Sequence, residues 1–145
     1  MKKPCVSFLV RLFHKKPCEI KNVLDVTMRT IRELTRHLSP EALSRYNGTD
    51  WIKYVNYLQN APCSYPISLV KLHNKELVIR SWNANQRFSY YTLHDSIHTL
   101  WLNGKAKTNM QSQLLLPGSF ISVSHHALFI IDSIEPSVSL HLYEK

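Results

Sequence analysis

The first third of the chain has apolar residues at helical spacing. Between residues 19 and 38 they recur every three or four positions, which is the pattern of an amphipathic helix. Ser39-Pro40 is typical of an N-cap followed by a first helical residue, so a second, short helix is predicted to begin there and to end at Asn47-Gly48. Thr49 can cap a third helix. The N-terminal part is therefore expected to be helical.

A second helical pattern lies in the middle of the chain. Leu93, Ile97 and Leu100 recur at i, i+4 and i+7. Ser89 can cap the first turn, because its hydroxyl oxygen can accept a hydrogen bond from a free backbone amide. Residues 89–99 are therefore predicted to form a short amphipathic helix.

Residues 67–72 and 75–83 fit two kinds of element. The first segment is short and apolar and suits a helix or a strand. The second suits a helix with Leu77 and Trp82 inward and Arg80 outward, and it suits a strand equally well. Periodicity leaves both alternatives open.

From residue 100 onward the pattern changes to that of β-strands. Asn103-Gly104 and Pro117-Gly118 are turn dipeptides, and residues 124–126 and 135–137 are predicted to bend two later hairpins. In residues 138–143 apolar and polar side chains alternate, which predicts a half-buried strand. The predicted strands cover residues 100–102, 112–116, 120–124, 127–132 and 138–143.

Composition and charge favour a basic, two-part protein. The chain has 145 residues and a formal net charge of +8, which favours an anionic partner, usually a nucleic acid. Residues 1–60 carry 11 Lys and Arg against 5 Asp and Glu, whereas residues 61–145 carry 7 against 5. Two prolines in residues 60–66 mark a linker, so two domains are predicted, 1–60 and 67–145. No run approaches 18 apolar residues, so no membrane-spanning segment is expected.

Two groups of basic residues in the N-terminal part each allow two interpretations. Arg29, Arg32 and Arg36 share one side of the predicted helix, either as a solvated face partly balanced by Glu33 or as an edge that contacts phosphates. Residues 1–17, with Lys15 and Lys16, form either an amphipathic targeting segment or an arm that lies along RNA.

No set of residues with catalytic or metal-binding spacing stands out. His94 and His98 lie four residues apart but lack the glutamate of a zinc-protease motif. The neighbouring His125 and His126 would point to opposite faces of a strand. The three cysteines include no Cys-x-x-Cys pair, which favours free thiols over zinc ligands. The chain is therefore expected not to be an enzyme and to need no metal, cofactor or small-molecule substrate.

Three stretches of the second half resemble the alpha-L RNA-binding module of the S-four family of small-subunit ribosomal proteins. They are Trp101-Leu102-Asn103-Gly104-Lys105, Asn109-Met110-Gln111-Ser112 and Pro117-Gly118-Ser119-Phe120-Ile121-Ser122-Val123. The chain departs from the family at Thr92-Leu93-His94, where the family has an arginine, and at Ser119, where it has an acid. The resemblance implies that residues 75–83 form the first helix of the module.

The resemblance implies an α+β fold, with an N-terminal helical lobe followed by a helix pair and a β-hairpin or meander. It implies a divergent organellar protein that binds ribosomal RNA beside neighbouring small-subunit proteins and supports subunit assembly and translation, in a mitochondrial ribosome or alternatively in the cytoplasm. The alternative is a non-catalytic adaptor that resembles a forkhead-associated β-domain. The expected RNA-binding residues are Arg80, Arg87, Tyr91, His94, His98, Asn103, Lys105, Lys107, Arg29, Arg32, Arg36, Lys15 and Lys16.

Overall fold

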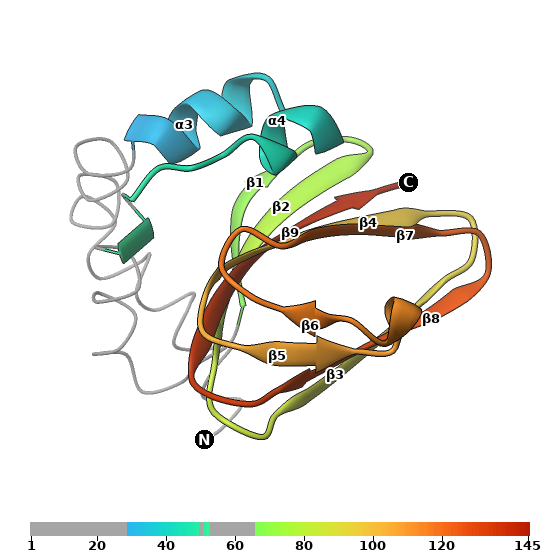
Figure 1. Ribbon diagram of the computed structural model, residues 1–145. Helices are drawn as coiled ribbons and strands as arrows, with labels where there is room; N and C mark the ends of the chain where they lie inside the picture. Colours follow the sequence, from blue (N-terminus) through green and yellow to red (C-terminus); the bar gives the residue numbers. More distant parts are fainter. Residues whose placement is uncertain (1–28, 50, 53–65) are drawn as a thin grey trace, which may run out of the picture. The chain divides into compact units, whose positions relative to one another are not determined.

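The computed structural model of the protein describes residues 29–49, 51–52 and 66–145 (Figure 1). Contacts divide the chain into two units, one of residues 1–38 and 46–65 and one of residues 39–45 and 66–145. The described elements are α3 (Arg29–Arg36), α4 (Pro40–Ser44), β1 (Ile67–Lys71), β2 (Lys75–Trp82), β3 (Arg87–Thr92), β4 (Ser96–Asn103), β5 (Ala106–Thr108), η1 (Met110–Ser112), β6 (Leu114–Leu115), β7 (Phe120–Ser124), β8 (Ala127–Ser133) and β9 (Ser137–Glu144).

The strands form two antiparallel sheets that face each other. One has the order β1-β2-β9-β4-β7 and the other the order β3-β8-β5-β6. Figure 1 shows β9, β4 and β7 on one side of the barrel and β3, β5 and β6 on the other. A hydrophobic core lies between the sheets. Its buried members come from both: Trp82, Ile97, Trp101, Ala106, Leu115, Val123, Phe129 and Ile131.

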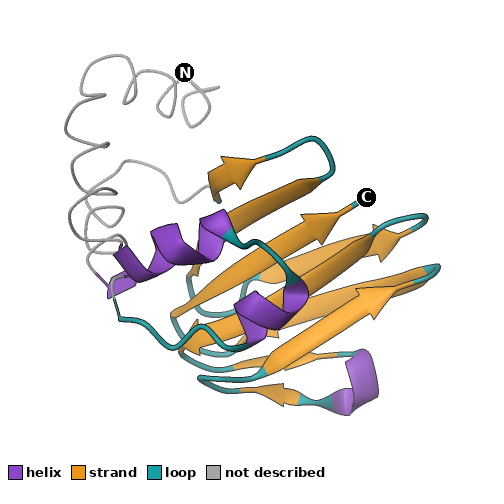
Figure 2. Cartoon of the chain, turned by 90° about the horizontal axis from the view of Figure 1, so that it is seen from above, coloured by secondary structure: helices purple, strands orange, loops and turns teal. Residues whose placement is uncertain are grey.

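The described chain after residue 66 is almost entirely β-structure, so the predicted α+β fold is wrong. In Figure 2 the single helical turn η1 is the only helix drawn in that part. Residues 75–83, expected as the first helix of a module, form β2. Leu77 and Ile79 are buried on one face of this strand, and Val78 and Trp82 are buried on the other. Burial on both faces removes the alternation that usually identifies a strand.

The predicted helix over residues 89–99 is also wrong, for the same physical reason. These residues form the end of β3, a turn and the start of β4. Ile97 faces the barrel core, while Leu100 is buried on the opposite face of β4. Leu93 lies in the turn and is 49% exposed. The apparent helical spacing therefore combines two residues on opposite faces of a strand, Ile97 and Leu100, with one in a turn, Leu93.

Local backbone signals in the second half are confirmed. Gly104 and Gly118 both have positive φ, at +85° and +94°, in the predicted turns. β7 covers the predicted Phe120–Ser124, and His125 and His126 join it to β8. Strands also occupy most of the other segments predicted after residue 100.

Two of the predicted N-terminal helices are present where the structure describes them, but the second ends at Ser44 and not at Asn47-Gly48. α4 begins at Pro40, and the Ser39 hydroxyl accepts a hydrogen bond from the Ala42 amide at 3.0 Å. α3 is helical as predicted, while residues 19–28 of the same prediction lie outside the described residues. The basic arm and most of the third predicted helix also lie outside them. The division into domains 1–60 and 67–145 stays a prediction. No described helix is both long and apolar enough to span a bilayer.

Candidate functional site

The barrel interior contains a chain of hydrogen bonds among four buried side chains from three strands. Trp82 Nε1 on β2 donates to Ser139 Oγ on β9 at 2.8 Å. Ser139 Oγ lies 2.7 Å from Nε2 of His141, two residues further along the same strand. The other ring nitrogen of His141, Nδ1, lies 2.8 Å from Thr99 Oγ1 on β4. The inward face of β9 is therefore polar, although it lies within an apolar barrel.

His141 is neutral in this chain of hydrogen bonds. Complete burial, with a smaller contribution from the nearby Arg80, lowers its pKa to about 3. A neutral imidazole carries one N–H, whereas the charged form carries two. Desolvation disfavours the charged form because burial removes the ring from bulk solvent.

The four side chains hold more hydrogens than their mutual bonds use. Trp82 and His141 supply one N–H each, and Ser139 and Thr99 supply one O–H each, but three hydrogen bonds join them. If His141 donates to Thr99, the Thr99 hydroxyl hydrogen has no acceptor in the chain. If it donates to Ser139, the Ser139 hydrogen has none. Either tautomer leaves one hydroxyl hydrogen available to another acceptor.

Arg80 adds a cation to the same interior face. Its guanidinium carbon lies 5.2 Å from the Trp82 ring centroid and 4.9 Å from that of Phe88. Burial lowers the pKa of Arg80, while the neighbouring Tyr143 opposes this effect. Its Nε is buried without a hydrogen-bond partner, and no ion pair joins it to a carboxylate within residues 29–49, 51–52 and 66–145.

A second buried donor in the interior also lacks a partner. Trp101 Nε1 makes no hydrogen bond, and its ring packs against that of Trp82 with centroids 5.3 Å apart. The two unpaired buried side-chain atoms in the described part of the chain, Arg80 Nε and Trp101 Nε1, are both donors. Buried donors without acceptors are uncommon in folded proteins. The interior therefore has a surplus of hydrogen-bond donors.

The interior reaches solvent beside Arg80. Arg80, Phe88, Tyr90 and Tyr143 are half-buried, unlike the fully buried centre of the barrel. The Tyr90 hydroxyl donates to the Asp95 carboxylate, and this bond lowers the pKa of Asp95. Burial raises the pKa of both tyrosines, so both hydroxyls stay protonated. Solvent thus meets a rim of aromatic rings and neutral hydroxyls.

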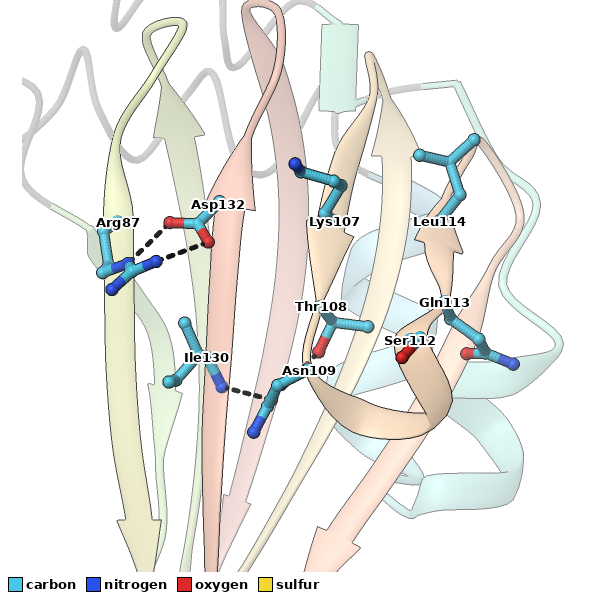
Figure 3. Close-up of a pocket in the computed structure, with 9 residues that line it drawn as sticks. All are labelled: Arg87, Lys107, Thr108, Asn109, Ser112, Gln113, Leu114, Ile130 and Asp132. Atoms are coloured by element: carbon cyan, nitrogen blue, oxygen red, sulfur yellow. Dashed lines mark hydrogen bonds and ion pairs between the residues drawn. The ribbon is translucent and has the colours of Figure 1, made fainter.

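The outer face of the four-stranded sheet carries a shallow pocket of about 390 Å³ (Figure 3). Arg87, Asp132 and Lys107 lie side by side across β3, β8 and β5. Arg87 binds both carboxylate oxygens of Asp132, at 2.7 and 2.9 Å, and these bonds lower the pKa of Asp132. Lys107 lowers it further from the other side. The acid between the two bases thus offsets much of their charge.

Asn109 lies at the end of this pocket, and both the nitrogen and the oxygen of its side-chain amide form hydrogen bonds. Its Nδ2 donates to the Leu128 carbonyl at 2.7 Å, and its Oδ1 accepts from the Ile130 amide at 2.8 Å. Figure 3 shows the Asn109 side chain turned toward Ile130. Because its polar groups are largely satisfied, the outer pocket offers a ligand fewer free hydrogen-bonding groups than the barrel interior does.

The residues expected to bind RNA are dispersed in the structure. Arg80 is inside the barrel, whereas Arg87 and Lys107 lie on the outer sheet face. Tyr91 and His94 lie near the β3–β4 turn. His98 is buried between Ser122 and Glu144, at 2.7 and 2.8 Å.

The remaining predicted residues lie elsewhere. Asn103 ends β4 and is exposed, and the Lys105 carbonyl accepts from the Ile134 amide in the next turn. Arg36 forms an exposed ion pair with Glu33 at 2.9 Å. Arg29 and Arg32 belong to α3, and Lys15 and Lys16 lie outside the described residues.

Sequence reasoning missed the interior residues Thr99, Ser139 and His141. The alternation of residues 138–143 was a usable signal, because it predicted a strand with a polar face that holds Ser139, His141 and Tyr143. That face was assigned to solvent, but it is the one that lines the barrel.

Comparisons with solved structures show a cupin fold, also called a double-stranded β-helix. One similar structure is a cupin superfamily protein from Desulfitobacterium hafniense DCB-2, with 16% identity, a TM-score of 0.50, and coverage of 57% of this chain and 78% of that chain. A candidate mannose-6-phosphate isomerase from Ralstonia eutropha JMP134 has 18% identity, a TM-score of 0.51, and coverage of 59% and 88%. The Cupin_2 domain of an XRE family transcriptional regulator from Enterobacter cloacae has 9% identity, a TM-score of 0.50, and coverage of 56% and 95%.

No family model and no curated protein matches the sequence. The cupin fold overturns the predicted membership of the S-four ribosomal family, and with it the ribosomal function and the partners, ribosomal RNA and small-subunit proteins. The forkhead-associated-like alternative is also unsupported. Proteins of this fold include both a candidate enzyme and a regulator domain, so the expectation of a non-enzyme stays a prediction.

Proposed function

We propose that this protein binds a small organic anion, a monocarboxylate, in the interior of its barrel. The observation that carries the proposal is Arg80, a cation packed against the rings of both Trp82 and Phe88 with a buried, unpaired Nε. A half-buried charge without an ion-pair partner is unfavourable, and an anion that pairs with it removes part of that penalty. A carboxylate suits the planar fork of a guanidinium, because two parallel N–H groups can donate to its two oxygens.

The groups around Arg80 favour an anion with a single charge. His141 is neutral, so it adds no positive charge to that of Arg80, and Tyr143 stays protonated, so it adds no negative charge. Glu76 shares the inward face of β2 and acts on Tyr143, but no ion pair joins it to Arg80. One guanidinium therefore balances one carboxylate, whereas a phosphate dianion would leave a charge unpaired in the interior.

A neutral donor is available for a remaining acceptor atom of such a ligand. Tyr143 lies close enough to Arg80 to affect its pKa, and its own hydroxyl is protonated in a half-buried side chain. The rings of Phe88 and Tyr90 lie parallel, with centroids 6.4 Å apart, and form an apolar surface that is half-buried, like Arg80. A short ligand with a carboxylate at one end and an apolar or weakly polar body matches this combination.

The proposed role is binding and not catalysis. Ser139 could be mistaken for a nucleophile because it contacts His141, but its oxygen already accepts the Trp82 N–H and is fully buried. With a pKa near 3, His141 is a weak base at neutral pH. Both residues are better suited to holding the Trp82 ring, on which Arg80 stacks.

The test is a thermal-shift and calorimetric titration with acetate, propionate, succinate and inorganic phosphate at low ionic strength. We expect the monocarboxylates to stabilise the wild-type protein and Arg80→Met to lose at least tenfold in affinity for them. Arg80→Lys should bind weakly, because it keeps the charge and loses the fork. Lys107→Met, which removes an exposed cation from the outer face, is the matched control and should bind like the wild type. Equal responses from Arg80→Met and the wild type would overturn the proposal.

A further inference from the structure

Two histidines that are far apart in the sequence meet on the outside of the barrel. His94 lies in the β3–β4 turn and His126 in the β7–β8 turn. Their rings meet edge to face with centroids 5.8 Å apart. Both histidines are exposed, as is Tyr91 on the outer face of β3. This His94–His126 pair is separate from the interior residues proposed to bind an anion.

Tyr91 orients one ring of the pair. Its hydroxyl lies 3.5 Å from His126 Nδ1, and the two ring centroids are 6.4 Å apart. A contact at one ring nitrogen of a histidine determines which nitrogen is left for another ligand. Nε2 of His126 is therefore the nitrogen available on the side away from Tyr91. Metal-bound histidines usually have such a partner at their second nitrogen.

The backbone that carries His126 adopts an unfavourable conformation for these residues. His125 and His126 form the two-residue turn between β7 and β8, with φ values of +64° and +55°. Positive φ at both central residues is the type I′ pattern, which strongly prefers Asn-Gly. Non-glycine residues held at positive φ cluster at functional sites. The turn thus keeps two histidines where other residues would be more stable.

Two other side chains that could bind a cation, His98 and Asp95, are already occupied. His98 uses both ring nitrogens, one with Ser122 and one with Glu144. In the same turn as His94, the two Asp95 oxygens accept from the Tyr90 hydroxyl and the Leu93 amide. Within the described residues no three His, Cys, Asp or Glu side chains are grouped as metal ligands. A cation here would have two protein nitrogens and open positions for water.

We propose that His94 and His126 bind a late first-row divalent cation such as Cu²⁺, Ni²⁺ or Zn²⁺, with Tyr91 as a positioning residue. Imidazole nitrogens suit these three ions and discriminate against Mg²⁺ and Ca²⁺, which prefer oxygen. The remaining coordination positions are open to solvent, because the pair lies in exposed turns on the surface. The site is therefore one at which an exchangeable ion binds.

The test is titration with Cu²⁺ and Zn²⁺, using calorimetry for affinity and electron paramagnetic resonance of the Cu²⁺ form for the ligands. We expect a site whose Cu²⁺ spectrum shows coupling to two imidazole nitrogens. His94→Asn and His126→Asn should each weaken binding at least tenfold and leave coupling to one nitrogen. Tyr91→Phe should weaken it a few-fold and leave both couplings intact.

The matched control is His125→Asn, which changes the other residue of the same turn. Asn suits positive φ, so this variant should fold normally and bind within twofold of the wild type. His126→Gly relaxes the backbone and should raise the melting temperature of the metal-free protein while it abolishes the site. The proposal is overturned if the double variant His94→Asn/His126→Asn binds like the wild type, or if His125→Asn loses as much affinity as His126→Asn.

Discussion

Trp82 and Trp101 pack against each other in the barrel with ring centroids 5.3 Å apart, yet only the Trp82 indole has a hydrogen-bond partner. Both rings are buried and similar in size, so they form a natural pair for measuring the contribution of one buried N–H.

Replacing each tryptophan with phenylalanine should give unequal losses of stability. Both changes remove buried ring atoms and leave space, but Trp82→Phe also breaks the bond to Ser139, whereas Trp101→Phe removes an unpaired donor. We expect Trp82→Phe to lower the free energy of unfolding by about 1 kcal/mol more than Trp101→Phe does. Urea denaturation of the two variants measures the difference. An equal or reversed loss would show that Trp101 Nε1 has a partner in solution.

Arg80→Met should stabilise the protein when no ligand is bound. The substitution removes a partly buried cation that lacks a counter-charge, and it keeps most of the side-chain volume. Lost stacking on Trp82 and Phe88 offsets part of the gain, so we expect a rise of about 1 kcal/mol. Chemical denaturation in an anion-poor buffer checks this, with Arg80→Lys expected to show no gain. If Arg80→Met is less stable than the wild type, Arg80 serves mainly to support the fold.

Acid should destabilise the protein through His141. The folded-state pKa of about 3 lies below the ordinary value of 6.5, so between these pH values the unfolded chain binds a proton that the folded chain does not. The contribution of His141 is fully present above pH 6.5 and falls by up to about 1.4 kcal/mol per pH unit below it.

His141→Gln keeps hydrogen-bonding groups at this position but cannot titrate. Denaturation curves between pH 7 and pH 4 should therefore be flatter for this variant than for the wild type. Parallel curves would mean that His141 is not the buried group responsible for acid sensitivity.

Two glycines in turns provide a matched pair for steric strain. A Cβ at Gly104 would lie 2.1 Å from Ser137 Oγ and 2.4 Å from the Pro136 carbonyl oxygen, whereas a Cβ at Gly118 meets nothing within 4 Å. Both have positive φ, so each alanine variant carries a backbone penalty of roughly 1 kcal/mol. Gly104→Ala should cost at least about 2 kcal/mol more than Gly118→Ala. Melting temperatures of the two variants test this, and similar values would show that the 135–137 turn moves away without cost.

The turns could be predicted from the sequence because local chemistry determines them. Asn103-Gly104 and Pro117-Gly118 require particular φ angles wherever they occur, and the structure has turns at both. The strand β2 and the first part of β4 could not be identified, because both of their faces are buried. Which positions of these strands are apolar depends on what packs against each face. The packing partners lie in distant parts of the chain.

The candidate site was hidden for a related reason. Alternation in residues 138–143 indicates that the two faces of the strand differ, but it does not say which face lies inside. Arg80 and His141 are polar, so both were expected outside, and both lie in the barrel interior. Only the pairing of β9 with β2 and β4 brings these residues together with Thr99.

The Asn109 side chain occupies the place of a missing strand residue beside β8. Its amide offers one donor and one acceptor to Leu128 and Ile130, as a backbone peptide group would. The Ile130 amide proton is therefore shielded from solvent exchange by a side chain and not by the sheet ladder. A rotation of Asn109 would free that proton without separating any strands. Deamidation to aspartate would remove the donor to the Leu128 carbonyl, so the far end of the sheet would loosen as the molecule ages chemically.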